Sequence, residues 1–454
     1  MNRVLVANRG EIAVRIIRAA HDLGLEAVAV YSEADAAATH VRMADAAVEI
    51  GPPAAGKSYL DMKAVVDAAQ SSGADGVHPG YGFLAERADF ASAVEDAGLR
   101  YIGPKPEHIA LMGDKARARE EAESGGVPTI PGSDGAVADV EEAATVAGEI
   151  GFPVALKAAG GGGGRGIRIV HEAEALQGQY KTAAREAAGA FDDARIYVER
   201  FISPARHVEV QVLGDGERAI HLHERECSLQ RRRQKVVEET PAPGLADATR
   251  AAMHEAAVSL ADAIGYRSAG TVEFLHDPAS GEFFFIEMNT RIQVEHPVTE
   301  LITGVDLIAE QLRIAAGEPL RLRQEDVVAR GCALELRINA EDPASKFRPS
   351  PGPLDRVVMP SGPWVRVDTW METGGEVPPY YDSLLGKLIV WGPDRATVLA
   401  RARRALGELV VEGVQTTKPL LTDLLAEDWF GAGEFDTGTL ETWLEATTNG
   451  SAEA

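Results

Sequence analysis

The chain has 454 residues, of which 45% are hydrophobic and 25% charged, so it is long enough for several domains and has the composition of a globular protein, not a disordered or fibrous one. Its 70 Asp and Glu outnumber its 45 Lys and Arg by 25, and a net negative charge of this size opposes general binding to nucleic acid. Cys227 and Cys332 are the only cysteines and neither belongs to a CxxC pair, which argues against a disulfide framework and a thiolate zinc site and fits a reducing cytoplasm. Charged residues interrupt the apolar first segment, so we expect neither a signal peptide nor a membrane span.

The first part of the chain alternates between short apolar strands and amphipathic helices. Residues 3–35 are predicted to form a βαβ unit, because an apolar run is followed by apolar residues at helical spacing and then by a β-branched run. The alternation continues to about residue 105, which is typical of an open parallel sheet. We therefore predict a first domain over residues 1–112. A charged segment that runs into Gly125, Gly126 and two prolines indicates a linker over residues 113–130.

Two further units are predicted beyond this linker. Residues 131–203 have the pattern of a small α+β unit, in which strands and helices flank the glycine run 160–164. From residue 204 the strands are longer and alternate more cleanly, with helices expected at 246–264 and 298–317, so we predict an antiparallel-rich region over residues 204–445. Residues 446–454 are expected to form a disordered tail.

Two segments resemble nucleotide-binding motifs but have features that argue against this function. Residues 51–58 fit the Walker A pattern G-x4-G-K-S. Pro52 and Pro53 would remove two of the backbone N–H donors with which such a loop holds phosphate, so we prefer to interpret the segment as a surface turn. The first βαβ turn, residues 8–11, lacks the three-glycine spacing of a dinucleotide-binding loop.

A stronger candidate for phosphate binding lies in the second unit. Lys157 ends a predicted strand, and after two alanines come five consecutive glycines and Arg165. A glycine run packs nothing and is entropically costly, so its expected use is as a mobile lid whose backbone lies on a phosphate chain. Lys115 is a second candidate cation. The alternative for the glycines is a plain flexible connector.

Residues 270–297 contain the most informative pattern in the chain. Glu273 interrupts an apolar strand, and polar side chains recur with period two from residue 287 to residue 295. In an extended segment these side chains share one face, which is either a site or an ordinary solvated face. Glu273, Glu287 and Asn289 offer the oxygen ligands that Mg²⁺ prefers.

The second half of this pattern changes in chemical character. Arg291 and Gln293 offer planar hydrogen-bond donors suited to a small oxyanion. Glu295 follows at the same spacing and is placed to accept a proton. We therefore expect an anion and a general base next to the metal ligands.

Three other features carry weaker predictions. Residues 230–235, QRRRQK, are either an anion site or a charged stretch that the flanking glutamates neutralise. His221 and His223 can ligate a metal from one strand face, but without an evident third ligand we prefer structural histidines. Cys227 has no evident base beside it, so a quiet thiol is preferred to a nucleophile.

Taken together and in this order, these segments are similar to the biotin carboxylases, which are ATP-grasp ligases. The resemblance covers almost the full length and is carried by VLVANRGEIAVRIIRAA, HPGYGFLAE, IGP, MGDK, KAAGGGGGRGIRIV, RHVEVQVL, QRRRQKVVEE, PAPG, GTVEFL, FIEMNTRIQVEHPVTE, RINAEDP and PYYDSLLGKLIV. It implies an ATP-grasp fold of α/β and α+β class, with a Rossmann-like N-terminal domain, a small lid domain and an antiparallel-rich C-terminal domain. It also implies ATP-dependent carboxylation of biotin by bicarbonate through carboxyphosphate.

The resemblance further assigns roles to individual residues. It implies that ATP is held by Lys115, Lys157, Gly163, Gly164, Glu199, Ile202, His207 and Glu273. The implied ligands of two Mg²⁺ or Mn²⁺ ions are Glu273, Glu287 and Asn289. Bicarbonate would be bound by Lys235, Arg291, Gln293 and the backbone of Val294, with Glu295 as general base. Arg337 would stabilise the enolate of biotin, and the biotin pocket would include Tyr81 and Asp382.

The chain also departs from the family pattern. Arg233 stands where the family often has a histidine that contacts the ribose, and residues 347–350 indicate an altered surface loop. No Ala-Met-Lys-Met biotinylation motif is present, so biotin is expected to arrive on a biotin carboxyl carrier protein, unless the chain is part of a longer one. The resemblance also implies carboxyltransferase partners and a homodimer.

Two functions remain open at this point. The first is the catalytic biotin carboxylase component of an acetyl-CoA or other acyl-CoA carboxylase. The second is a regulatory or scaffold component on the same fold that has lost turnover, which the complete set of candidate catalytic residues opposes. A different ATP-grasp ligase would account for the ATP and metal residues but not for Arg337 and the segment RIQVEHP.

Overall fold

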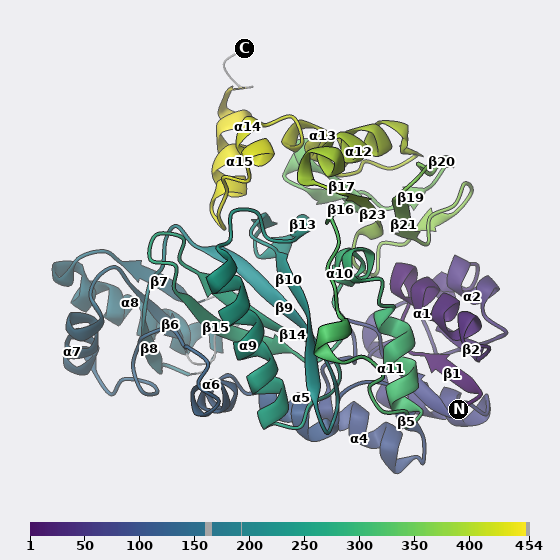
Figure 1. Ribbon diagram of the computed structural model, residues 1–454, viewed down its shortest axis with the longest axis horizontal. Coiled ribbons are helices and arrows are strands. Elements are labelled where there is room, and N and C mark those ends of the chain that lie inside the picture. The colour runs from purple at the N-terminus through teal and green to yellow at the C-terminus, as the bar shows by residue number, and fades with distance from the viewer. Residues whose placement is uncertain (159–165, 192, 451–454) are drawn as a thin grey trace.

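A parallel five-stranded sheet forms the N-terminal part of the protein. The computed structural model describes residues 1–158, 166–191 and 193–450 (Figure 1). The sheet has the order β3-β2-β1-β4-β5, and its strands are β1 Arg3–Val6, β2 Glu26–Tyr31, β3 Ala46–Glu49, β4 Gly76–His78 and β5 Arg100–Tyr101. The helices between them are α1 Gly10–Asp22, α2 Thr39–Met43, α3 Met62–Ser71 and α4 Ala88–Asp96. The predicted βαβ unit and the alternation that follows it are confirmed.

The Walker-like segment forms a turn and not a phosphate loop. Residues 55–57 are a short 3-10 helix, and α3 begins only at Met62, where the Asp61 side chain caps its N-terminus. A phosphate loop instead leads directly into a helix whose first N–H groups face the phosphate. The interpretation of residues 51–58 as a surface turn is confirmed.

The predicted linker is an ordered helical segment. Helices α5 Pro106–Gly113 and α6 Lys115–Ser124 follow the parallel sheet. Ala118 and Ala122 lie four residues apart on one face of α6 and are buried in a hydrophobic cluster with Phe285. This helix therefore packs on β15 (Phe283–Asn289) and brings its first residue, Lys115, to the edge of the central sheet.

A small α+β unit lies at one side of the molecule, to the left in Figure 1. Its antiparallel sheet has the order β7-β6-β8, with β6 Val154–Ala158, β7 Ile167–Val170 and β8 Ile196–Arg200. Helices α7 Val140–Ile150 and α8 Ala173–Phe191 pack against it. The predicted α+β pattern of strands and helices is confirmed, and the glycine run with Gly163 and Gly164 lies outside the described residues.

The centre of the protein is an eight-stranded antiparallel sheet. Its order is β15-β14-β9-β10-β13-β16-β23-β21, with β9 Arg206–Asp215, β10 Ala219–Glu226, β13 Val237–Thr240, β14 Arg267–His276, β16 Cys332–Asn339, β21 Val365–Thr369 and β23 Leu384–Gly392. Helix α9 (Asp247–Ala263) packs on β9 and β10, and α12 (Arg395–Glu408) packs on β16 and β23 (Figure 1). The antiparallel-rich region predicted from residue 204 onwards is confirmed.

Short elements complete the chain around this sheet. The strands are β11 Gln230–Arg231, β12 Gln234–Lys235, β17 Glu341–Asp342, β18 Arg348–Pro349, β19 Gly352–Pro353, β20 Arg356–Val358, β22 Glu376–Val377 and β24 Val410–Glu412. The C-terminal helices are α13 Lys418–Leu424, α14 Asp428–Ala432 and α15 Thr439–Gly450. The expected disordered tail is wrong for residues 446–450, which continue α15, and residues 451–454 lie outside the described residues.

The single helix predicted over residues 298–317 is also wrong. Two helices occupy this region, α10 His296–Thr303 and α11 Leu307–Ala315. Gly304 ends the first in a left-handed conformation with φ of 73°, and the Asp306 side chain accepts a hydrogen bond from the backbone N–H of Ala309 to begin the second. The apolar pattern runs through both helices and hides this break.

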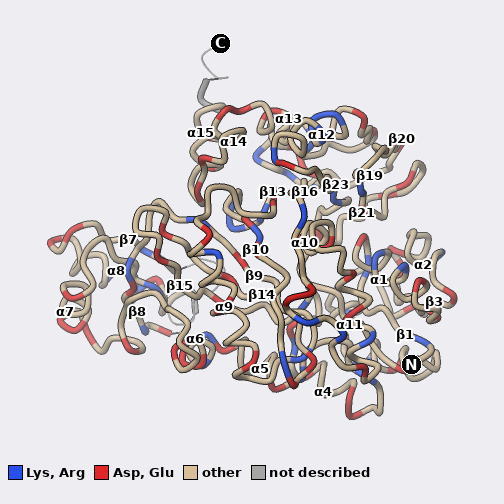
Figure 2. The backbone as a smooth tube through the Cα atoms, viewed as in Figure 1, with Lys and Arg blue, Asp and Glu red and all other residues tan. Residues whose placement is uncertain are grey.

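Charge is distributed over the whole molecule. Figure 2 shows acidic and basic residues interspersed along the described chain. No helix among the described residues is both long and apolar enough to cross a membrane. The domain boundaries at residues 112, 130, 203 and 445 stay predictions.

Buried histidines are expected to make the fold sensitive to acid. Burial lowers the pKa of His40 to about 4 and that of His78 to about 3, whereas an unfolded histidine has a pKa of about 6.5. Between these values the unfolded chain binds more protons than the folded chain, so the free energy of unfolding decreases as the pH falls below about 6.5. Each such histidine contributes about 1.4 kcal/mol per pH unit in this range.

This dependence can be measured with a single substitution. We expect the melting temperature of His40→Gln to fall less than that of the wild type between about pH 7 and about pH 5, because the variant has one buried titrating group fewer. His171 is exposed, so His171→Gln is the control and should follow the wild type. Identical pH dependence in His40→Gln and the wild type would contradict this prediction.

Candidate active site

A cleft of about 1910 Å³ contains most of the predicted site residues. Those that line it are Tyr81, Lys115, Lys157, Glu199, His207, Lys235, Glu273, Glu287, Asn289, Arg291, Gln293, Val294, Glu295, Arg337 and Asp382. Ile202 instead packs in a small cluster with Ala205 and Phe284, and its neighbour Phe201 lines the cleft. The cleft therefore joins the α+β unit, the central sheet and the N-terminal part of the chain.

Strand pairing places the predicted metal ligands together. Glu273 on β14 is the cross-strand partner of Glu287 on β15, and the Asn289 amide donates to Glu273 at 2.8 Å. Burial and the charge of Glu273 raise the pKa of Glu287. Two carboxylates and an amide oxygen in this position fit a divalent cation, which relieves the repulsion between the carboxylates.

The segment after β15 differs from its prediction. The strand ends at Asn289, and residues 290–295 form an irregular turn that leads into α10. The expectation of one extended face is therefore wrong for Arg291, Gln293 and Glu295. All three side chains nevertheless line the cleft. The Gln293 amide points back toward β14 and donates to Glu273 at 2.9 Å.

Lys235 lies among three carboxylates at the floor of the cleft. Its Nζ donates to Glu209 at 2.5 Å, to Glu295 at 2.6 Å and to Glu273 at 3.2 Å. Burial opposes its charge, but the three carboxylates raise its pKa well above the ordinary value. Lys235 is therefore a fixed cation at neutral pH, and the two-stranded β11–β12 hairpin positions it.

Glu295 connects Lys235 to Arg337. One of its oxygens accepts from Lys235, and the other accepts from Arg337 Nη2 at 3.0 Å. Burial would raise the pKa of Glu295, but the charges of Lys235 and Arg337 hold it well below the ordinary value. The group is thus ionised throughout the neutral range, as a proton acceptor must be. Arg337 is held in turn by Glu238, which accepts from its Nε at 2.6 Å.

Three further basic side chains line the cleft. Lys157 on β6 pairs with Glu199, and Lys115 is the first residue of α6. His207 Nε2 lies 3.0 Å from Glu273, and although burial opposes a charge on this ring, the carboxylate raises the pKa of His207. Basic side chains from three different elements thus line the cleft, and such groups suit the binding of a chain of phosphates.

Several residues of the site were not predicted from the sequence. Arg225 is fully buried, and its guanidinium donates to Glu209 at 2.6 Å and to Gln293 at 2.7 Å. Lys387 is also fully buried and donates to the Val294 carbonyl at 2.7 Å. These groups fix the position of the residues that line the site. A charged side chain within an otherwise apolar strand was the sequence feature that could have identified them.

The two departures from the family pattern occupy distinct places. Arg233 lines the cleft and has a positive φ of 66°. Phe347 lies outside the cleft lining, and the Arg231 guanidinium stacks over its ring at 3.7 Å. The altered loop therefore packs against the hairpin that carries Lys235.

Comparison with known proteins agrees with this geometry. Over 444 residues the chain is 51% identical to biotin carboxylase 1 of Bacillus subtilis (strain 168), and the alignment covers 98% of this chain and 99% of that protein. The chain belongs to the biotin carboxylase family. Successive segments match the family descriptions "Biotin carboxylase, N-terminal domain" over residues 1–109, "Carbamoyl-phosphate synthase L chain, ATP binding domain" over 114–323 and "Biotin carboxylase C-terminal domain" over 335–442.

Two further relatives extend the comparison. The biotin carboxylase of Pseudomonas aeruginosa is 52% identical over 443 residues, which cover 97% of this chain and 98% of that protein. The biotin carboxylase domain dimer of Hydrogenobacter thermophilus 2-oxoglutarate carboxylase, solved with MgADP, ADP and bicarbonate, has a TM-score of 0.89 and 50% identity and covers 97% of each chain. The predicted family and mixed fold class are confirmed, and the chain is an ATP-dependent ligase that carboxylates biotin.

Proposed function

We propose that this biotin carboxylase performs the first half-reaction of an acyl-CoA carboxylase, and that its chemistry is centred on Glu295. The observation that carries the proposal is the single ionised carboxylate that Lys235 and Arg337 both contact inside the cleft. When a carboxylate between two cations accepts a proton from a substrate, it loses its own charge. Both cations can then stabilise negative charge on the substrates. The acyl-CoA is chosen by the carboxyltransferase that uses the carboxybiotin.

The metal ions and ATP are assigned to the end of the cleft near β15. Glu273, Glu287 and Asn289 would hold the divalent ions, which when bound offset the charge of the phosphates during transfer. Lys115 and Lys157 approach from α6 and β6 to bind the phosphate oxygens. Lys157 belongs to the α+β unit and Lys115 does not, so the α+β unit could close on the nucleotide and exclude water.

Bicarbonate is assigned to the space between Lys235 and Arg291. Lys235, Arg291, Gln293 and Val294 all line the cleft, and the Gln293 amide and the backbone of Val294 would contact the anion. As a bicarbonate oxygen attacks the γ-phosphorus, Glu295 accepts the bicarbonate proton, ADP leaves and carboxyphosphate forms. The fixed cations stabilise the charge that gathers on the transferring group.

Biotin is assigned to the neighbouring space beside Arg337. Breakdown of carboxyphosphate would release CO₂ and phosphate there; the phosphate would accept the N–H proton of biotin, and the biotin nitrogen would attack CO₂. The negative charge that develops on the ureido oxygen is stabilised by the Arg337 guanidinium. Tyr81 and Asp382 also line the cleft and would flank the bicyclic ring.

Metal binding gives a test of the assigned ligands. Glu287→Gln is expected to raise the Mg²⁺ concentration for half-maximal activity by about tenfold or more, because a neutral amide replaces a charged ligand. Initial rates measured against Mg²⁺ at constant ATP report this shift. Glu282→Gln, at an exposed position before the same strand, is the matched control. If both variants required the same Mg²⁺ concentration, Glu287 would not be a metal ligand.

The remaining proposals concern partners and location. Biotin would be presented by a biotin carboxyl carrier protein, and the carboxybiotin would be passed to a carboxyltransferase in the cytoplasm. The dimer of the related Hydrogenobacter domain supports a homodimer. Transfer of labelled bicarbonate to a purified biotinylated carrier should exceed transfer to free biotin at the same concentration, and equal rates would oppose recognition of the carrier.

A further inference from the structure

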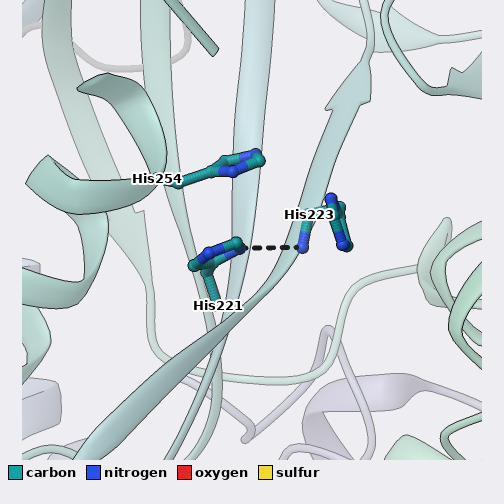
Figure 3. Close-up of side chains that lie close together, drawn as sticks. All are labelled: His221, His223 and His254. Carbon is teal, nitrogen blue, oxygen red and sulfur yellow. Dashed lines mark hydrogen bonds between the residues drawn. The ribbon is translucent and has the colours of Figure 1, made fainter. Parts of the chain in front are cut away.

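Three histidines meet outside the cleft, between β10 and α9. His221 and His223 belong to β10, and His254 belongs to α9. One ligand nitrogen from each of the three rings lies within 4.8 Å of the other two. Figure 3 shows the His221 and His254 rings one above the other, with their centroids 4.1 Å apart, and the His223 ring beside them. None of the three lines the cleft.

The backbone of β10 directs the His223 ring to this place. The register of β10 against β9 shifts between His221 and Glu224, and His223 has a φ of 68°. A bulge of this kind changes the direction of a side chain relative to a regular strand. As a result, the His223 ring lies 5.4 Å, between centroids, from both of the other rings.

The hydrogen bonds leave ring nitrogens available. The Nε2 of His254 lies 2.8 Å from Glu224, so its Nδ1 is not needed for that contact. The Nδ1 of His221 accepts only a long bond of 3.4 Å from the backbone N–H of His223. Burial, the larger effect, lowers the pKa of the His223 ring, although the backbone of Val327 raises it. The Nε2 of His223 is buried and has no hydrogen-bond partner among the described residues. A buried ring nitrogen without a partner is costly in a folded protein.

The surroundings support neutral rings with fixed orientations. Burial lowers the pKa of His221 to about 3 and also lowers that of His223, so neither ring must lose a proton to coordinate a metal. Glu224 is fully buried and also accepts from Arg250 at 2.7 Å. A carboxylate fixed in this way can orient the His254 ring as an outer partner of a metal ligand.

We propose that His221, His223 and His254 bind one transition-metal ion of the Zn²⁺ class and thereby connect β10 to α9. Three imidazoles leave a fourth coordination position for water. Imidazole ligands select Zn²⁺, Ni²⁺ or Cu²⁺, whereas Mg²⁺ takes oxygen ligands. This site is therefore separate in chemistry and position from the carboxylates of the cleft.

The test is a metal titration of the full chain. Protein stripped with a chelator and supplied with excess Mg²⁺ is titrated with Zn²⁺ against a chromogenic competitor, and we expect about one tightly bound Zn²⁺ per chain. His223→Gln and His221→Gln should each weaken Zn²⁺ binding by about 100-fold or more. Loss of a residue that binds the metal directly should reduce affinity at least as much as loss of a residue that hydrogen-bonds to a ligand. ATP turnover with Mg²⁺ should be unchanged, because the cluster lies outside the cleft.

The controls separate this site from other metal-binding groups. His171→Gln, at an exposed position, should bind Zn²⁺ as the wild type does. The melting temperature of each metal-free variant confirms that it is folded. The proposal is overturned if the wild type binds no Zn²⁺ at micromolar concentrations, or if folded His223→Gln and His221→Gln bind it as tightly as the wild type.

Discussion

Glu295→Gln is expected to lower the rate of bicarbonate-dependent ATP cleavage by about 10³-fold, within the range for loss of a general base. The amide has the same size and can still accept a hydrogen bond from Lys235 or Arg337, but it cannot take the proton of bicarbonate. The substitution also removes one of the three negative charges around Lys235. Phosphate release at saturating MgATP, bicarbonate and biotin measures the effect.

The same substitution at an exposed position supplies the control. Glu255 is exposed on α9, and Glu255→Gln should retain the wild-type rate. A melting curve for Glu295→Gln shows whether the buried cluster still folds. A folded variant that kept more than about a tenth of the wild-type rate would exclude Glu295 as the general base.

Arg337→Lys is expected to lower carboxylation of biotin by about 10² to 10³-fold, the usual cost of losing a donor to a developing oxyanion. Lysine keeps the positive charge between Glu238 and Glu295 but not the planar fork that contacts both. It therefore tests the donor geometry without removing the cation that pairs with buried Glu238, as Arg337→Ala would do. The loss should be smaller for bicarbonate-dependent ATP cleavage measured without biotin.

Two measurements of the same reaction separate the roles of Arg337. Labelled carboxyl transfer to biotin reports the second step, and phosphate release without biotin reports the first. Arg356 lies at an exposed position paired with Glu412, and Arg356→Lys should leave both rates unchanged. If Arg337→Lys lowered both rates equally, Arg337 would act in ATP cleavage and not in stabilising the biotin enolate.

Local sequence patterns predicted the parts of the structure that depend on near neighbours. The βαβ unit over residues 3–35 follows from hydrophobic periodicity alone. The proximity of the predicted metal ligands also followed from local pattern, because β14 and β15 form a hairpin and place Glu273 opposite Glu287. The break at Gly304 was missed although its signals, a glycine and a following Asp306 cap, stand in the sequence.

The cluster around Lys235 depends on contacts that no local pattern contains. Lys235 comes from a hairpin, Glu209 from β9 and Glu295 from the turn before α10, and only the folded sheet brings them together. Arg337 is 42 residues from its partner Glu295, and resemblance to the family, not spacing, selected it. The sequence analysis missed His254 for the same reason. It lies on helix α9, and only the packing of this helix on β10 brings it next to His221 and His223.

Phosphate release from MgATP, with and without bicarbonate and with and without biotin, is the most direct test of the assigned chemistry. We predict that the wild type needs bicarbonate for turnover, that biotin increases the rate, and that Glu295→Gln loses the bicarbonate-dependent part. ATP binding without turnover, or turnover that responds to neither bicarbonate nor biotin, would contradict a reaction centred on Glu295 between Lys235 and Arg337.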